Sequence, residues 1–321
     1  MAALYACVVL PSIAALQPHR PCSGLGGLYN AEDRDFFNER YLGTPPEMSG
    51  AEPNDVHAGS RPVWAPSVGL IRDLEMLALH TWPAAEVVKL DGWQLRCNWG
   101  ITRRANSVWP NETTQALSLE EKLASVESFY ASRQQVARFQ ICPASQPADL
   151  DAELDRRGYT QHAHTVTQVA GVATVLAATC VPTAHRVTVT ETLSDAWLTA
   201  YSQAECMSHH EAEVRRGILA RIEPGTAFAV LSLGGQPVTT GLGVLERGWL
   251  GVLCIATALE LRRRGAATAI LHALADWAGN HGAEQMYLQV MRDNAPARAL
   301  YDRAGFRPLY EYHYREARSM T

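Results

Sequence analysis

The apolar positions of the chain follow two periods, one typical of helices and one typical of strands. Leu119, Leu123, Val126 and Tyr130, for example, share one face of a helix. β-Branched and aromatic runs between glycine-rich or polar turns predict strands. We predict helices over residues 70–80, 119–132, 148–157, 194–206, 209–221, 265–280 and 294–304. We predict strands over residues 93–97, 103–109, 137–142, 159–169, 187–191, 226–233, 237–246, 249–257, 284–291 and 306–315.

Strands that interleave with helices indicate an α/β fold with a mixed central sheet. Small and polar residues over 171–184 predict a linker between a first half, 65–170, and a second half, 185–321. Residues 1–64 contain seven of the seventeen prolines and show no sustained apolar period. We expect an irregular leader there that has no function, and a translation start assigned too far upstream would give the same pattern.

The two halves share a weak internal repeat. The segment DRRGY at 155–159 corresponds to DRAGF at 302–306, and RFQI at 138–141 corresponds to MYLQ at 286–289. In both copies of the first pair a predicted helix ends at a glycine, which can take the left-handed conformation after the last helical turn, and an aromatic residue then opens a strand. The matching order of elements favours a duplication.

Composition and charge exclude several classes of function. A net charge of −5 gives no overall electrostatic basis for binding nucleic acid or an anionic membrane. The apolar start of the chain lacks a basic residue before its apolar run, is interrupted by Pro11 and is too short to span a bilayer, so we expect a cytoplasmic chain. The seven cysteines never form Cys-x-x-Cys, and His209-His210-Glu211 is not His-Glu-x-x-His, so we expect no metal.

Candidate chemistry begins where the strand at 249–257 leads into the helix at 265–280. Arg262, Arg263, Arg264 and Gly265 are followed by two alanines, so a ligand can approach the backbone closely. The unpaired N–H groups of the first helical turn, the helix dipole and three guanidinium groups together favour a bound anion. A solvated basic surface would give the same pattern.

A second candidate segment is DNAPARALYDRAGF at residues 293–306. Asn294 is suited to cap the helix, Pro296 is tolerated in its first turn, and Gly305 ends it. Tyr301 lies on this helix, where most tyrosines are half-buried packing residues.

Together, the two segments resemble the signatures of the GNAT acetyltransferase superfamily. Arg262-x-x-Gly-x-Ala after Ile255-Ala-Thr is similar to its pyrophosphate loop, and Asn294-x-x-Ala-x-x-Leu-Tyr301 is similar to its second signature. The resemblance covers nearly all of 66–316 and extends to a bacterial group with a degenerate, GNAT-like first half, distantly like mycothiol synthase. The motifs of this group include Leu90-Asp-Gly-Trp and Thr102-Arg-Arg-Ala-Asn-Ser-Val.

The resemblance implies an acetyl-CoA-dependent N-acetyltransferase that acts by direct attack of a primary amine. Tyr301 would be the general acid that protonates the departing thiolate. The implied acetyl-CoA-binding residues are Ile255, Ala256, Thr257, Arg262, Arg263, Arg264, Gly265, Ala266, Ala267, Thr268, Asn294 and Tyr301.

The general base is less well defined. Some members of the superfamily carry a glutamate where this chain has Gly251. Glu246 is our first candidate; Glu211, His210 and an ordered water relay are others. This gap gives weight to an alternative function, an acetyl-CoA-binding sensor or pseudoenzyme without turnover.

The first half lacks the residues for cofactor binding. Its helix at 119 is preceded by Glu112-Thr-Thr-Gln-Ala-Leu-Ser, which is neither basic nor glycine-rich, and Leu154 is the counterpart of Tyr301. We expect this half to bind no cofactor and to support the second half or form a wall of the acceptor pocket. The acceptor, a small-molecule or peptide amine, and the oligomeric state are left open.

Deleting residues 1–62 should leave folding and activity nearly unchanged, because this segment shows no core-forming pattern. Thermal melting and release of free CoA thiol, compared with the full chain, test this prediction. A large fall in melting temperature would show that the leader belongs to the core.

Overall fold

The structure is a computed structural model that describes residues 66–183, 185–223 and 225–318. The predicted leader, 1–64, lies outside the described residues. Within them, no helix combines the length and the apolar composition needed to cross a membrane.

The helices begin at polar caps in most cases, as at Ser118, Ser194 and Ser208, whose side chains accept from backbone N–H groups of the first turn. The described helices are α2 (Val68–His80), α3 (Leu119–Ala131), α4 (Leu150–Arg156), α5 (Val172–Ala178), α6 (Asp195–Ala204), α7 (His209–Leu219), the 3₁₀ turn η1 (Leu259–Leu261), α8 (Ala266–Asn280) and α9 (Ala295–Arg303).

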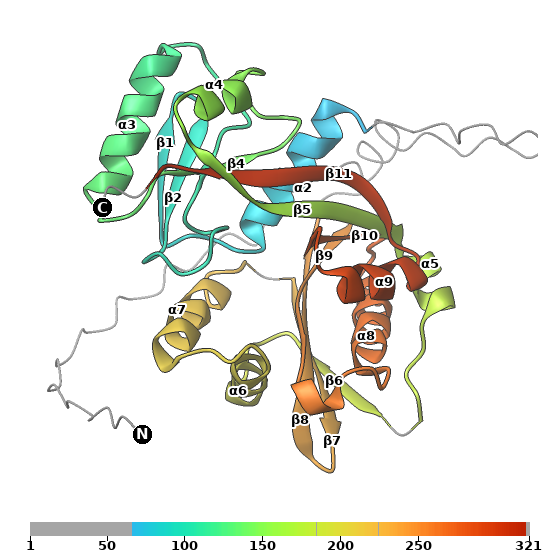
Figure 1. The fold of residues 1–321 in the computed structure, drawn as a ribbon. Coiled ribbons are helices and arrows are strands. Elements are labelled where there is room, and N and C mark those ends of the chain that lie inside the picture. Colours follow the sequence, from blue (N-terminus) through green and yellow to red (C-terminus); the bar gives the residue numbers. More distant parts are fainter. Residues whose placement is uncertain (1–65, 184, 224, 319–321) are drawn as a thin grey trace, which may run out of the picture.

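The strands join in one mixed sheet (Figure 1). They are β1 (Glu86–Leu90), β2 (Trp93–Cys97), β3 (Val108–Trp109), β4 (Arg138–Ile141), β5 (Thr160–Gly171), β6 (Arg186–Thr190), β7 (Thr226–Leu233), β8 (Gln236–Glu246), β9 (Trp249–Thr257), β10 (Gln285–Met291) and β11 (Arg307–Glu316). Their order in the sheet is β1-β2-β3-β4-β11-β5-β10-β9-β8-β7-β6. Only β3–β4 and β9–β10 are parallel pairs.

This order shows that the two halves exchange their last strands. β11, the last strand of the second half, pairs with β4 of the first half, and β5, the last strand of the first half, pairs with β10 of the second. β5 and β11 also pair with each other along most of their length. Neither half therefore has a complete sheet without the other.

The two copies of the repeat have the same backbone geometry. Gly158 and Gly305 both have positive φ, 79° and 95°, directly after α4 and α9. The N–H of the following aromatic residue then donates to a helix carbonyl, Tyr159 to Leu154 at 3.0 Å and Phe306 to Tyr301 at 2.9 Å. Leu154 and Tyr301 therefore hold equivalent places in the two halves, as predicted.

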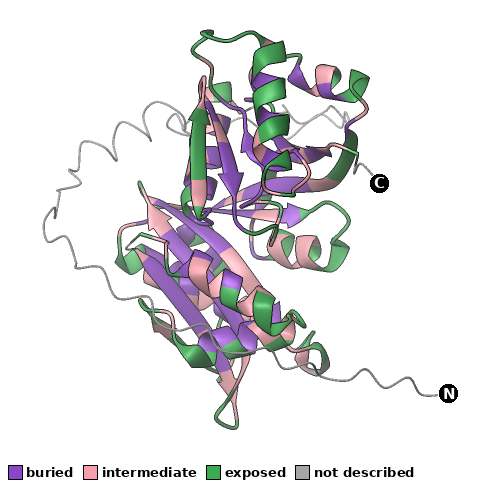
Figure 2. Ribbon diagram, turned by 90° about the vertical axis from the view of Figure 1, so that its left-hand side faces the viewer, coloured by how far each residue is buried: buried purple, intermediate pink, exposed green. Residues whose placement is uncertain are grey.

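Helices cover both faces of the second-half strands (Figure 1). α5 and α8 pack on one face, where Ile270, Leu271 and Leu274 belong to the largest buried cluster. α6 and α7 pack on the other face through Trp197 and Ile218. Figure 2 shows the buried strands between the more exposed helices.

Helix α2 belongs to the first half in sequence but packs on the strands where the halves meet. Its Leu70, Ile71 and Leu74 contact a cluster that includes Tyr287 of β10 and Tyr310 of β11. The C-terminal end of α2 thus lies against the second half.

A buried carboxylate on α2 connects the same strands. Glu75 is 1% exposed and accepts hydrogen bonds from the Tyr310 hydroxyl at 2.7 Å, Gln289 Nε2 at 3.1 Å and Gln140 Nε2 at 2.6 Å. Burial raises the pKa of Glu75 above its ordinary value, although the bonds from Tyr310 and Gln140 and two arginines oppose the shift. One side chain thereby links β4, β10 and β11.

Several predicted or missed elements differ from the structure. The predicted strand 103–109 is only β3, because residues 98–107 form a loop around the buried side chain of Asn106. Its Oδ1 accepts from the N–H groups of Asn98 and Gly100, and its Nδ2 donates to the carbonyl of Thr102. The predicted linker, 171–184, contains α5, and β1 was not predicted.

Ending the chain at residue 304 should unfold both halves, because β4 and β5 would each lose the neighbour that β11 provides. Circular dichroism and thermal melting should show no cooperative transition near that of the parent protein. The matched control ends the chain at residue 318, after β11, and should melt like the parent. Cooperative melting of the shorter chain at the parent temperature would contradict the structural role of the exchanged strand.

Candidate active site

The sheet opens between β9 and β10. The parallel pairing of these strands runs from Trp249–Gln285 to Val252–Leu288 and stops there, although both strands continue. A bulge in β9 lies just beyond this point, with Cys254 at a φ of 52° and a register shift against β8. Ile255–Thr257 therefore presents backbone groups toward the opening, where an extended ligand can pair with them.

The loop after β9 leads into a helix whose N-terminus has no side-chain cap. Gly265 is the N-cap residue of α8 with a φ of 81°, and no side chain bonds the first N–H groups of the helix. A Cβ placed on Gly265 would meet no protein atom within 4 Å, so the space over this backbone is open. Arg262, Arg263 and Arg264 are exposed beside it. These groups can hold an anion such as a pyrophosphate.

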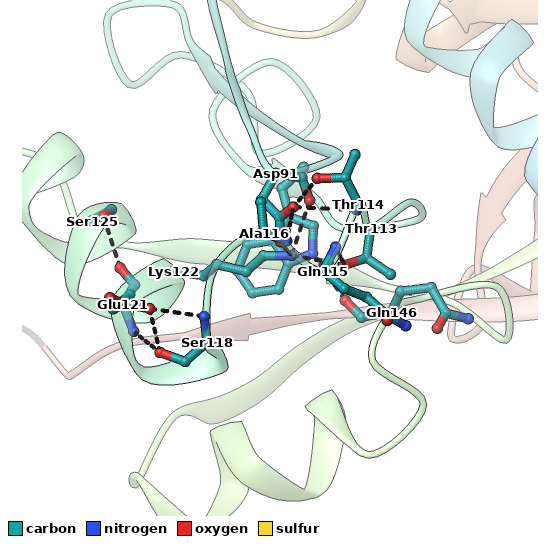
Figure 3. Close-up of polar contacts among 11 residues, drawn as sticks. Asp91, Thr113, Thr114, Gln115, Ala116, Ser118, Glu121, Lys122, Ser125 and Gln146 are labelled. Carbon is teal, nitrogen blue, oxygen red and sulfur yellow. Dashed lines mark hydrogen bonds and ion pairs between the residues drawn. The ribbon is translucent and has the colours of Figure 1, made fainter.

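The corresponding helix of the first half is closed to anions. Ser118 and Glu121 form a capping box at the start of α3, with the Ser118 N–H donating to Glu121 at 2.9 Å. The loop before it is held by Asp91, which accepts from the N–H groups of Thr114 and Ala116 and pairs with Lys122 (Figure 3). An anion would meet carboxylates there and no open helix N-terminus.

Tyr301 lies on α9 and is partly buried against the same core cluster as Ile255 of β9. Its ring packs edge-on to Phe306, with ring centroids 6.0 Å apart, and no described residue bonds its hydroxyl. Burial raises the pKa of Tyr301 to about 12. The hydroxyl is therefore protonated at neutral pH and can donate. Asn294 caps α9 by accepting from the Ala297 N–H at 3.2 Å.

The three candidate bases lie in different environments. Glu246 ends β8 and pairs with His80 Nδ1 at 2.8 Å. Glu211 closes the capping box of α7, and its bonds to Ser208 lower the pKa of its carboxyl. His210 is exposed in the first turn of α7. None of the three lines the cavity described below.

The position where some superfamily members carry glutamate is filled by another side chain. A Cβ on Gly251 would lie 2.6 Å from the Tyr287 hydroxyl and 2.9 Å from Thr81 Cγ2. The ring of Tyr287, which comes from β10, thus takes the space that a larger residue at 251 would need. Gly251 is required for this packing.

A cavity of about 300 Å³ reaches the point where β9 and β10 separate. The second half contributes the strand ends at Val252–Cys254 and Leu288–Gln289. The first half contributes the end of α2 and the loop Thr102–Arg104, which Asn106 holds in place. The cavity therefore has walls from both halves.

The polar residues of this cavity were not predicted from the sequence. Arg103, Arg104, Arg215, Tyr287 and Tyr312 all line it. The only signal for them in the sequence is the segment Thr102-Arg-Arg, which is part of the family resemblance.

Cys254 also lines the cavity. Burial raises the pKa of the Cys254 thiol to about 11, so it is a neutral thiol and a poor nucleophile. Among the described residues, no group of three or more His, Cys, Asp or Glu side chains is arranged to hold a metal ion.

A sheet that opens at a strand bulge beside an uncapped helix defines an acyltransferase of the GNAT class. A family model described as "Probable histone acetyltransferase Rv0428c C-terminal" matches residues 69–315, and the chain belongs to this acetyltransferase family.

Two named relatives agree with this assignment. The chain is 32% identical over 247 residues to "Uncharacterized N-acetyltransferase YobR" of Bacillus subtilis, a match that covers 76% of this chain and 98% of the relative. It is 26% identical over 251 residues to "Probable histone acetyltransferase Rv0428c" of Mycobacterium tuberculosis, covering 78% and 75% of the two chains. Both names support acetyl transfer.

Solved structures share the fold. A GCN5-related N-acetyltransferase from Kribbella flavida superposes with a TM-score of 0.58 at 14% identity, covering 79% of this chain and 96% of the other. A tandem GNAT protein from the clavulanic acid biosynthesis pathway gives a TM-score of 0.54 at 12% identity, covering 66% and 74%. The predicted α/β GNAT fold with a mixed sheet is confirmed.

Replacing Gly265 with valine should weaken acetyl-CoA binding severely, because the new side chain enters the space over the helix N-terminus. Gly248→Val is the matched control. Gly248 has a similar φ of 75° and equally open surroundings, but it lies in the turn before β9. It should carry the same backbone strain and bind acetyl-CoA normally. Equal affinities of both variants and the parent in calorimetry would contradict the assignment of the loop.

Proposed function

We propose that this protein transfers the acetyl group of acetyl-CoA to a primary amine by direct attack, with Tyr301 as the general acid. The observation that carries the proposal is the opening of the sheet after Val252 and Leu288, between the uncapped helix α8 and the cavity. A thioester laid into this opening would meet an amine that enters from the cavity side.

The pantetheine arm would pair with the exposed backbone of Ile255, Ala256 and Thr257 as an extra strand does. The pyrophosphate would lie on the N–H groups of residues 263–268, namely Arg263, Arg264, Gly265, Ala266, Ala267 and Thr268, with Arg262 beside them. The Nε of Arg262 already donates to the Thr257 carbonyl at 3.1 Å, which fixes the loop against the strand. Asn294 would contact the pantetheine arm from α9.

In the chemical step the amine nitrogen attacks the thioester carbonyl, and the C–S bond breaks as the amide forms. A backbone N–H at the open edge of β9 would stabilise the oxyanion. Tyr301 would donate its hydroxyl proton to the departing sulfur. A tyrosine of pKa about 12 is a weaker acid than a thiol of about 8.5, so Tyr301 acts first as a hydrogen-bond donor.

The attacking amine must lose a proton before it reacts, because a free alkylammonium has a pKa of about 10.4. Of the three candidates, Glu246 is the best placed base, because its charge acts on Tyr287, a residue of the cavity wall. A water chain would carry the proton from the cavity to the Glu246–His80 pair. Glu211 is engaged in its cap, and His210 faces solvent.

A second candidate function is an acetyl-CoA-binding sensor without turnover. Gly251 favours it, because a superfamily glutamate is replaced there and its space is filled by Tyr287. Incubation of the protein with acetyl-CoA and a panel of amines separates the two functions. Thiol release with any amine supports the enzyme, whereas acetyl-CoA binding without release supports the sensor.

Tyr301→Phe should lower kcat and kcat/KM together by at least about tenfold, with acetyl-CoA affinity unchanged. The change removes one hydroxyl and keeps the ring that packs on Phe306. The hydrogen bond from the Tyr301 hydroxyl to the sulfur strengthens only as the C–S bond breaks, so loss of the hydroxyl affects the transition state. Steady-state kinetics and calorimetry measure the two quantities.

The control is Leu154→Ala, at the equivalent place in the first half. Leu154 is fully buried, so the variant should lose about 2–5 kcal/mol of stability without a selective loss of kcat in the folded protein. Parent-like turnover of Tyr301→Phe would leave water as the acid and Tyr301 as a packing residue.

A further inference from the structure

We propose that the amine acceptor carries an anionic group, a carboxylate or a phosphate, which the arginines of the cavity hold. This inference rests on the proposed acetyl transfer and names its substrate class. It comes from the charge of the cavity wall and from the unused donors of one buried guanidinium group.

The cavity is lined by Arg103, Arg104 and Arg215, and no aspartate or glutamate is among its described lining residues. Arg104 comes from the first-half loop and Arg215 from α7, so the guanidinium groups approach from different walls. The charges of Arg104 and Arg215 both act on the Cys254 thiol, at the strand bulge. An anion beside the bulge would lie within the influence of both arginines.

Arg215 has a hydrogen-bond donor that no described residue accepts. Its Nη1 donates to the Tyr201 hydroxyl at 3.1 Å, while its Nε is buried and bonds to no described residue. A buried donor left unpaired is unfavourable, and a guanidinium group offers five N–H donors in a planar fork. A carboxylate or phosphate that binds this fork would satisfy them at once.

The nearby carboxylates do not cancel this charge. Glu75 acts on Arg104 from behind the wall, but its oxygens are bonded to Tyr310, Gln140 and Gln289, and burial raises the pKa of its carboxyl. Glu246 pairs with His80 outside the cavity. Glu205 also acts on the Cys254 thiol and Glu211 acts on Arg215, but Glu205 is exposed, Glu211 is bonded to Ser208 in its cap, and neither lines the cavity. The field inside is therefore positive, and it would repel a polyamine or a lysine-rich peptide.

The same field assists the chemistry. Like charges near an ammonium group lower its pKa, so the arginines favour the neutral amine that attacks. An acceptor whose anionic group binds Arg215 would hold its amine beside these charges. The arginines thereby supply part of what a glutamate at position 251 supplies elsewhere in the superfamily.

The test compares matched pairs of amines that differ in one anionic group. The pairs are β-alanine with propylamine, 4-aminobutyrate with butylamine, and phosphoethanolamine with ethanolamine. For the parent protein, kcat/KM should be at least about tenfold higher for the anionic member of at least one pair, because a charge-assisted hydrogen bond contributes about 1.5–3 kcal/mol. The third pair separates phosphate from carboxylate.

Arg215→Gln should remove most of this preference and leave acetyl-CoA affinity unchanged. Arg216→Gln is the matched control, because Arg216 is the next residue on α7 and pairs with Asp195 and Glu213 outside the cavity. It should keep the preference of the parent. If Arg215→Gln weakens acetyl-CoA binding instead, the arginine serves the donor and the inference is wrong.

Binding without turnover separates this inference from the proposed function. Calorimetry with the protein saturated with CoA measures the affinity for each amine directly. Anionic amines that bind more tightly than their neutral partners, with no thiol release, would support the anion site and contradict the enzyme. Turnover that favours spermidine or a lysine peptide, or binding that ignores the negative charge, would overturn the inference.

Discussion

The pairing of β5 with β11 in the middle of the sheet is the constraint on which the site depends. Each of these strands completes the sheet of the half to which it does not belong in sequence. Their pairing holds α2 and the loop at Thr102–Arg104 against the open ends of β9 and β10. A second half alone would keep the open strand edge but would lose one wall of the cavity.

The two halves differ at only a few residues between a helix N-terminus that is open to an anion and one that is closed. Both place a helix after a strand of the sheet. In the second half Gly265 starts this helix and leaves its N–H groups without side-chain partners. In the first half Ser118 and Glu121 use the equivalent groups, and Asp91 fixes the loop before them. These contacts occupy the helix N-terminus of the first half, which keeps its place in the sheet.

The sequence was sufficient for most elements of the second half, because its strands and helices carry clear periods and caps. β7 and β9 lie at the predicted residues, α8 begins one residue later than predicted, and α9 differs by one residue at each end. The loop around Asn106 was mistaken for a strand, because the hydrogen bonds by which the Asn106 side chain fixes the backbone leave no pattern in the local sequence. The short helix α5 was not predicted, because it lies in a run of small residues that was interpreted as a linker.

The candidate site likewise contains one part that the local sequence predicts and one part that it does not. The pyrophosphate loop and Tyr301 lie in contiguous motifs, so local sequence was enough to propose them. The cavity brings Arg104, Arg215 and Tyr287 together from three distant segments, and only the strand order makes them neighbours. The filling of the space at Gly251 by Tyr287 is likewise a contact between strands, which no local pattern encodes.

The exchanged strands also impose an order on biosynthesis. β4 is synthesised early, yet its neighbour β11 is the last strand of the second half, and Arg138 pairs with Glu316, 178 residues further on. Until β11 has been made, the first half has an unpaired strand edge, which is open to pairing with other chains. Contacts of such long separation also form slowly. A growing chain of this protein is therefore most exposed to misassembly in the interval before its last strand is made.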